Sequence, residues 1–472
     1  MSTHTNTISQ PDPKRWKALF LLCFANFLVI MDASIIQIAL PSIKEALGYT
    51  QESLQWVMSA FLLFFGGFLL LGGRLADLFG NRRIFNLGVV ILAISSLFAG
   101  LAWSEMILNI SRAVQGMGSA LIAPAALSMV MQLFSFSNKE KGKALAFWGL
   151  SGAAGGAFGI VLGGVLTGFF SWRWPLLIYV PLSALVLILS PMLLRKSDRI
   201  VKGNIDYIGA VLVTASLMLI VYGIVTAEHS GWQSSNTIIS LIVGVVLFLI
   251  FLLVESKTKE ALLPLNIFKT PHLGIGNIGV FFVQAAWFPL MYMVILYLQQ
   301  VLQFSPSAGA MAVLPVPIFM AFFMVVVAEK VLAKFGMKMT MILGFIILGA
   351  GNILFSQLAT VDGTYVISVL FPSFFAALGN ALAYLAATTA SVSEVESEKS
   401  GVASGLYNTN FQIGSAIGLA IMVAIAGTTT NSSNATSAVT ALNEGFQQAF
   451  FWSGIVAFIG AILALLFMRS KK

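Results

Sequence analysis

Long runs of apolar residues, separated by short polar stretches, recur along almost the whole 472-residue chain. A helix needs about 20 apolar residues to cross a hydrocarbon core of roughly 30 Å. The pattern therefore predicts fourteen membrane-spanning helices, at 18–40, 54–73, 84–103, 106–133, 142–169, 174–194, 206–227, 237–255, 274–299, 307–328, 339–358, 365–391, 402–427 and 447–468. An even number of spans places both termini on one side of the membrane.

The positions of Lys and Arg indicate which side this is, because cytoplasmic loops carry an excess of basic residues. With a cytoplasmic N-terminus, all 26 basic residues except Lys44, Arg112 and Arg173 lie in the tails, the inner loops or the adjoining helix ends. A miscount by one span would destroy this alternation. We therefore expect fourteen spans, both termini in the cytoplasm, and a long polar outer loop at about 428–446.

The amino-acid composition agrees with a protein whose surface is mostly in contact with lipid. Hydrophobic residues make up 58% of the chain and charged residues only 9%, whereas soluble domains carry about 25%. The net charge of +8 follows the predicted orientation and does not indicate nucleic-acid binding. A single cysteine, Cys23, excludes a disulfide framework, and the three His lie outside the predicted spans, so we expect no metal site. The polar start of the chain predicts no cleaved signal peptide.

A short motif occurs twice. The segment GGRLADLFGNRR at 72–83 has a weaker counterpart, EKVLAKFGMK, at 329–338, in which Gly336 matches Gly80. Each segment follows the second span of a six-span unit. We therefore expect these parts: a cytoplasmic tail at 1–17, a six-helix bundle at 18–194, a linker with two extra spans at 195–272, a second six-helix bundle at 273–468, and a tail at 469–472. Parallel repeats of this kind are typical of secondary transporters that bind substrate between the halves.

Several motifs at particular spans identify a family. They are Gly73-Arg-Leu-Ala-Asp77-Leu-Phe-Gly80-Asn-Arg82-Arg83, LVIMDASIIQIALP at 28–41, RAVQGMG at 112–118, YLQQVLQFSPSAG at 297–309 and SGLYNTNFQIG at 404–414. With these motifs the chain resembles the major facilitator superfamily, and within it the fourteen-span drug:proton antiporters. The resemblance implies an all-α integral membrane protein with the major facilitator fold, in which two six-helix bundles flank two extra central helices.

The chain departs from that family at two positions. Ile160 stands where many members have a proline that is often linked with antiport, and Phe411 stands where many have a basic residue.

Asp32 is the only carboxylate clearly inside a predicted span, about 14 residues or roughly 21 Å from its start. Ionised groups in a bilayer core are costly and generally functional. Desolvation favours a protonated carboxyl and a nearby cation favours a charged one, so one group can link proton release to cation binding. Arg112 lies at a similar depth and is the obvious partner, directly or through water and Gln115. The alternatives are a structural acid held by backbone and an arginine that only packs the bundle.

The loop motif at 72–83 is a second candidate functional site. Gly73, Arg74, Asp77, Gly80, Arg82 and Arg83 bring an acid and several bases to one turn, where they can pair with each other and with a helix terminus. We expect a conformational gate there, the alternative being a simple positive-inside anchor. In the fifth span, Gly155, Gly159, Gly163 and Gly164 have the spacing that permits close helix packing in lipid.

Polar and aromatic residues within the spans are candidates for a substrate pocket, since aromatic faces attract organic cations. They are Gln37, Gln55, Trp56, Gln115, Trp148, Gln284, Trp287, Asn380, Tyr384, Asn408 and Gln412. Taken singly, each Trp or Tyr is equally typical of helix packing or of the membrane interface.

The glycine clusters lack the Gly-Lys-Ser/Thr ending of a phosphate-binding loop, and no nucleophile–base–acid set is present, so neither an ATP-driven pump nor an enzyme is indicated. We expect a proton-coupled exporter of amphipathic, cationic or zwitterionic drugs that works by alternating access without a cofactor. The expected setting is a bacterial plasma membrane, where the protein is a monomer in contact with lipid. The alternatives are an exporter of one metabolite, antibiotic or lipid-like compound, and a membrane sensor that transports nothing.

Overall fold

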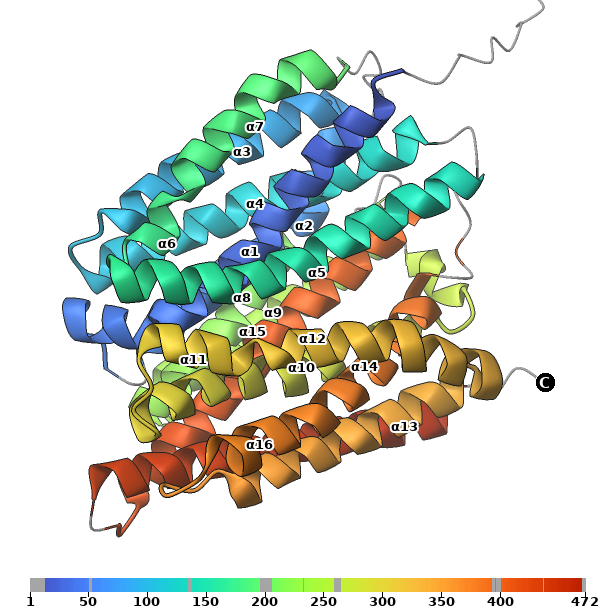
Figure 1. Cartoon of the computed structure of the whole chain (residues 1–472). Helices are drawn as coiled ribbons and strands as arrows, with labels where there is room; N and C mark the ends of the chain where they lie inside the picture. Colours follow the sequence, from blue (N-terminus) through green and yellow to red (C-terminus); the bar gives the residue numbers. More distant parts are fainter. Residues whose placement is uncertain are drawn as a thin grey trace, which may run out of the picture.

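The computed structural model describes residues 13–50, 53–134, 138–195, 206–231, 233–258, 265–392, 395, 400–435 and 437–468. Within some helices the described part includes the backbone but not every side chain, and the side chain of Asp77 is among those left outside it. The described residues form helices and connecting loops, with no β-strand among them. The prediction of an all-α protein is thus confirmed (Figure 1).

The helices of the first half are α1 Arg15–Leu47, η1 Ser53–Gln55, α2 Trp56–Phe79, α3 Asn81–Gly100, α4 Glu105–Leu133, α5 Asn138–Phe169, α6 Trp174–Leu177 and α7 Tyr179–Leu193. Their ends follow local chemistry. Gly48 closes α1 in the left-handed conformation (φ 78°), which glycine adopts without strain. Ser104 begins α4, where its side chain accepts a hydrogen bond from the Ile107 amide, as expected of an N-cap.

Two extra helices follow, α8 Tyr207–Ser230 and α9 Ser235–Lys257, and then η2 Leu265–Lys269. The second half comprises α10 Leu273–Leu296, η3 Tyr297–Val301, α11 Pro306–Val313, α12 Pro315–Phe322, η4 Phe323–Ala328, α13 Glu329–Leu358, η5 Val366–Leu370, α14 Phe371–Val392, α15 Ser400–Ser432 and α16 Ala438–Phe467. The segments η3, η4 and η5 are π-helical.

Each of the fourteen predicted spans falls on helix. Eleven segments of the described chain are long and apolar enough to cross a membrane, and Ser53–Leu69 and Ile208–Ile224 are shorter apolar helices. One of the eleven, Pro306–Leu358, has 53 residues and would extend about 80 Å if straight. It turns at Gly336 (φ 74°), so it provides two of the predicted spans.

Gly80 forms a matching corner between α2 and α3, with φ 93°. Positive φ values of this size are readily adopted only by glycine. The two corners therefore support the predicted correspondence between Gly80 and Gly336.

The predicted outer loop at 428–446 is wrong, because α15 continues to Ser432 and α16 begins at Ala438. The polar side chains of this segment suggested a loop, but they form hydrogen bonds within the helices. Thr428 donates to the Ala424 carbonyl oxygen at 2.9 Å, and Ser432 donates to that of Thr428 at 2.8 Å. Hydroxyls that return to the preceding turn are satisfied inside a helix, so a Ser- and Thr-rich segment need not leave it.

The helices of each half pack mainly on one another. In the first half α1 packs on α5, while α4 packs on α2 and α3. In the second half α13 packs on α14 and α16, and α10 packs on α15. In Figure 1 the first half, in blue to green, lies above the second half, in yellow to red. The division into two bundles with the boundaries 18–194 and 273–468 remains a prediction.

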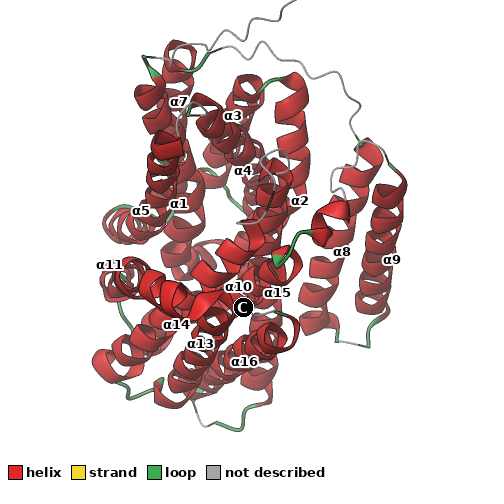
Figure 2. Cartoon of the chain, turned by 90° about the vertical axis from the view of Figure 1, so that its right-hand side faces the viewer, coloured by secondary structure: helices red, strands yellow, loops and turns green. Residues whose placement is uncertain are grey.

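The helices α8 and α9 pair with each other, and α8 packs on both α2 and α15 (Figure 2). Thr214 of α8 donates a hydrogen bond to the Gly67 carbonyl oxygen at 2.9 Å, and the ring of Tyr222 lies 6.3 Å from that of Trp56. The extra pair therefore lies beside the contact between a first-half helix and a second-half helix.

Direct contacts between the halves include a group near the ends of α1 and α5. Gln299 donates a hydrogen bond to the Ile38 carbonyl oxygen at 3.2 Å. On α5, Gly164 lies against Ala310 and Gly168 against Ser307 of α11. Further along, Gly66 of α2 lies against Gln412 of α15. The first three contacts share the end of the molecule that holds Lys44 and Arg173, the two basic residues predicted on the outer side.

Candidate functional site

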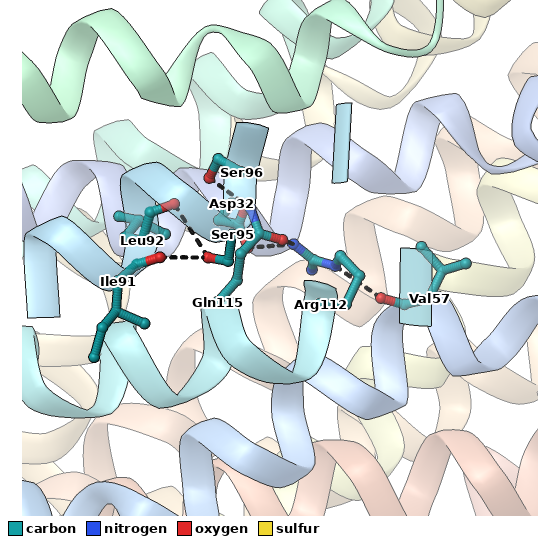
Figure 3. Close-up of polar contacts among 8 residues, drawn as sticks. All are labelled: Asp32, Val57, Ile91, Leu92, Ser95, Ser96, Arg112 and Gln115. Carbon is teal, nitrogen blue, oxygen red and sulfur yellow. Dashed lines mark hydrogen bonds and ion pairs between the residues drawn. The ribbon is translucent and has the colours of Figure 1, made fainter. Parts of the chain in front are cut away.

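Asp32 and Arg112 form an ion pair inside the first half, with 2.5 Å between Oδ2 and Nη1 (Figure 3). Neither side chain has any exposed surface. Asp32 comes from α1 and Arg112 from α4, which are adjacent in the bundle. The predicted pairing of the two residues is therefore present, and it is direct.

The arginine is held at several points. Its Nε donates to the Val57 carbonyl oxygen at 2.9 Å, and its Nη1 also donates to Gln115 Oε1 at 2.9 Å. Gln115 in turn donates from Nε2 to Ser96 Oγ at 2.7 Å. The guanidinium carbon lies 4.5 Å from the centre of the Phe61 ring. Together these contacts fix the plane of the guanidinium.

Glycines let the helices come close enough to build this cluster. Gly116 lies against the backbone of Phe61 and Phe65 on α2, and Gly118 lies against that of Gly88 on α3. A Cβ at Gly118 would be 2.9 Å from the Gly88 carbonyl oxygen, which is too close for a larger residue. The RAVQGMG motif therefore supplies charge at Arg112, an amide at Gln115, and small residues at the helix contacts.

Burying an ion costs several kcal/mol, and only good geometry with additional hydrogen bonds offsets that cost. Arg112 has such bonds, but the cluster is incompletely satisfied. Asp32 Oδ1 and Arg112 Nη2 are buried without a hydrogen-bond partner in the described part of the chain. One oxygen of the carboxylate is held by Arg112, and the other remains able to receive a proton.

Two buried hydroxyls on α7 were not predicted. Tyr179 and Ser183 are both completely buried, and Tyr179 lies within electrostatic range of Asp32 and Arg112. A tyrosine followed four residues later by a serine, inside an apolar span, was the available signal.

The predicted gate residues gather at the corner between α2 and α3. Arg82 donates from Nη1 to the Leu194 carbonyl oxygen at 3.0 Å, at the end of α7. Arg74 is half-buried and Arg83 is exposed, while the side chain of Asp77 lies outside the described part. The corner therefore contacts one helix terminus, as the loop motif predicted, and its role as a gate remains a prediction.

The candidate pocket residues do not meet at one place. Gln115 belongs to the ion-pair cluster, Trp56 faces Tyr222 of α8, and the Trp148 carbonyl oxygen accepts a hydrogen bond from Asn26. The other residues of the first half, Gln37 and Gln55, are buried.

In the second half, Tyr384 accepts a hydrogen bond from the Tyr407 hydroxyl at 2.6 Å, and both rings lie about 6.4 Å or less from Phe411. Gln284 accepts a hydrogen bond from Ser415, and Asn380 donates one to Met320 Sδ at 3.3 Å. The remaining candidates are Trp287, Asn408 and Gln412, of which Gln412 is buried and the others half-buried.

The glycines of α5 form two packing faces. Gly155, Gly159 and Gly163 lie directly on the backbone of α1 between Phe27 and Ile35, and Gly164 lies on α11. The helix that carries Asp32 is thus pressed closely against α5. Ile160 is half-buried against apolar residues in this region.

Gly159→Val is expected to destabilise the protein, because a Cβ there would lie 2.9 Å from the Met31 carbonyl oxygen. Overpacking of this kind costs about 1–3 kcal/mol. Gly149→Val on the same helix is the matched control, since nothing lies within 4 Å of that position. Melting temperatures in detergent would be compared, and equal values for the two variants would contradict the close α1–α5 packing.

Comparison with known proteins places this arrangement in a family. The sequence matches the Major Facilitator Superfamily over residues 22–210 and 207–419. Puromycin resistance protein pur8 of Streptomyces alboniger is 36% identical over 344 residues, which cover 72% of this chain and 67% of that protein. Cephamycin export protein CmcT of Amycolatopsis lactamdurans is 35% identical over 371 residues, covering 77% of this chain and 75% of that one.

Solved structures share the fold at low sequence identity. A POT family transporter in complex with a thioalcohol-conjugated peptide has a TM-score of 0.70 and 15% identity, covering 96% of each chain. A bacterial homolog of the human lysosomal transporter Spinster, in an inward-facing and unoccupied conformation, has a TM-score of 0.67 and 18% identity, covering 96% of this chain and 97% of that one. On the sequence matches and this fold, the chain is a multi-pass membrane protein and not an enzyme, and it belongs to the Major Facilitator Superfamily.

Proposed function

We propose that this transporter exports amphipathic, cationic or zwitterionic drugs in exchange for protons. The observation that carries the proposal is the buried Asp32–Arg112 pair, because a titratable group inside a membrane bundle is costly to keep and is generally functional. The named activities of related proteins, puromycin resistance and cephamycin export, support export of such compounds. The bacterial source of these relatives supports a bacterial plasma membrane.

The pair gives the first half two electrostatic states. With Asp32 ionised, its charge balances that of Arg112 across α1 and α4. A proton on Asp32 removes that balance and weakens the attraction between the two helices, so the packing of α1 against its neighbours can change. A local charge change that biases an element with two arrangements is the usual basis of a switch. Protonation from the outside and release to the inside would drive export by alternating access between the two halves.

The proposed orientation has both termini in the cytoplasm, in agreement with the distribution of Lys and Arg. In that orientation the corner at Gly80 faces the cytoplasm, and the bond from Arg82 to the end of α7 belongs to the inner gate. The contacts of α5 and Gln299 with the second half then close the outer side.

Purified protein in vesicles with an imposed pH gradient tests the proposal directly. We expect proton-driven accumulation of several dyes and antibiotics, together with proton release when such compounds are added to the protein in detergent. Transport that is indifferent to the gradient, or that occurs only with another ion, would contradict proton coupling.

The second candidate function is export of one particular compound. The relative that is named a cephamycin export protein favours this function. The same vesicles distinguish the two functions. A broad exporter moves structurally unrelated cations at comparable rates, whereas a dedicated exporter moves one chemical class and leaves the rest.

Gln299→Ala is expected to shift the protein toward an outer-open state, because it removes the hydrogen bond to Ile38 between the halves. A net contribution of about 1 kcal/mol corresponds to a roughly fivefold change in population. The measurement is labelling of an introduced Ser307→Cys by a membrane-impermeant maleimide, since Ser307 lies against Gly168 in the closed contact. Gln303→Asn, on the exposed turn nearby, is the control. Equal labelling rates in both backgrounds would show that Gln299 does not hold this contact.

A further inference from the structure

Helix α7, which packs on the helix of Asp32, carries two hydroxyl groups on one face. Tyr179 and Ser183 are four residues apart and therefore lie on the same side of the helix. Both are completely buried, and α7 packs on α1 and α3, the helices of Asp32 and Ser96. Within the described part of the chain, neither hydroxyl has a hydrogen-bond partner.

A buried hydroxyl without a partner costs about 1–3 kcal/mol, and a phenylalanine would fill the place of Tyr179 without that cost. Buried polar groups of this kind generally bond to an ordered water or serve in the chemistry of the site. Tyr179 has a specific reason to be polar, because it lies within electrostatic range of both Asp32 and Arg112.

One oxygen of the Asp32 carboxylate is available to receive a proton from this hydroxyl. Arg112 holds Oδ2 of Asp32, and Oδ1 has no hydrogen-bond partner in the described chain. A proton that arrives at the intact pair must therefore bind at Oδ1. The group that delivers it must be polar, buried and on a helix in contact with α1. Tyr179 meets these conditions, because it is a completely buried hydroxyl on α7, which packs on α1.

The position along the membrane also fits. Tyr179 lies five residues after Trp174, the start of α6, or about 7.5 Å along the helix axis. Asp32 lies fifteen residues before Leu47, the end of α1 at the same side of the membrane, or about 22 Å. Arg112, which holds the carboxylate, lies seven residues after Glu105, the start of α4 at that side, or about 10 Å along the helix axis, so by either count Tyr179 lies no deeper than the ion pair.

We infer that Tyr179, assisted by Ser183, relays protons between the outer side and Oδ1 of Asp32. The tyrosine hydroxyl passes its proton to Oδ1 through a bridging water, because the two oxygens do not bond to each other in the structure, and its oxygen takes a proton from a water on the outer side. The tyrosine is neutral before and after the step, and the net result is one proton on Asp32. This inference rests on the proposed proton-coupled function, and Tyr179 acts through Asp32.

The test compares Tyr179→Phe and Ser183→Ala with Tyr292→Phe, which removes the hydroxyl of another buried tyrosine, in the second half. Vesicles report two rates, transport driven by a pH gradient and exchange of labelled for unlabelled substrate without a gradient. Tyr179→Phe is expected to slow the driven rate at least about tenfold, as loss of a proton-transfer group does, and to leave exchange and substrate affinity unchanged. Tyr292→Phe should alter neither rate.

Each other outcome is decisive. An unchanged driven rate in Tyr179→Phe, in vesicles where the parent protein responds to the gradient, overturns the relay alone. Absence of any response in the parent overturns the proposed function instead. Equal slowing of both rates indicates a packing role and contradicts the relay. If Tyr179→Phe does not fold, Tyr179→His is the deciding variant. Because histidine can also transfer protons, this variant should retain gradient-driven transport with an altered solvent isotope effect. A Tyr179→His protein that has a normal melting temperature but does not transport contradicts the inference.

Discussion

Asp32→Asn is expected to reduce gradient-driven transport to the level of empty vesicles while the protein still folds. Asparagine keeps the shape of the side chain, and its amide oxygen can still accept a hydrogen bond from Arg112. It cannot take up or release a proton, so the charge of the cluster no longer changes during the transport cycle. Substrate-induced proton release from the purified protein should disappear at the same time.

Glu45→Gln is the matched control, because it removes a carboxylate from an exposed position on the same helix. It should transport like the parent protein. Binding of a fluorescent substrate to both variants, measured without a gradient, separates loss of coupling from loss of affinity. Unchanged proton release in Asp32→Asn would remove Asp32 from the coupling mechanism.

The membrane segments and the ion pair could be predicted because they follow from properties of single segments. Runs of about twenty apolar residues mark the spans, and one acid and one arginine within such runs must find partners. The depths of Asp32 and Arg112, counted along their helices, were already similar. Gln115 was correctly joined to the pair because it lies three residues from Arg112, on the same face of α4.

Other features depend on how distant segments meet, and the sequence does not encode these in a local pattern. Trp56 is an example, since its neighbour Tyr222 belongs to an extra helix whose packing position no motif predicts. Tyr179 is another, since only the packing of α7 on α1 and α3 places its hydroxyl in the interior of the first half. The prediction of a loop at 428–446 failed for a different, local reason. Its polar residues were taken to mark the end of a helix, but their hydroxyls bond to the preceding helical turn.

The close contact between α1 and α5 connects the ion pair to the outer closure. Gly159 and Gly163 hold α5 on the backbone of α1 within four residues of Asp32, and Gly164 of the same helix touches Ala310 of the second half. A shift of α1 that follows protonation of Asp32 must therefore move α5 or break this packing. The helix that carries Asp32 and the helix that touches the other half therefore cannot move independently.

Removing Arg112 is expected to have the largest effect on stability. Arg112→Gln leaves the carboxylate of Asp32 buried, while Nε and Nη1 no longer bond to Val57 and Gln115. Breaking one partner of a buried pair costs about 3–5 kcal/mol, so the melting temperature in detergent should fall clearly and gradient-driven transport should be lost. Asp32→Asn alone should cost less, since it keeps the bonds that Arg112 makes to Val57 and Gln115.

The double variant Asp32→Asn with Arg112→Gln gives the decisive comparison, because coupled residues do not add. Two neutral amides can bond to each other without a buried charge, so the double variant should be more stable than Arg112→Gln alone. It should still fail to transport in response to a pH gradient, because no carboxylate remains at the site to take up the proton. If the stability losses of the two single variants simply added in the double variant, the two side chains would not act as a pair. If the double variant regained gradient-driven transport, the proton would bind at a residue other than Asp32. Stability recovered without transport is the result that assigns the pair to coupling, since a pair kept only for packing would regain both together.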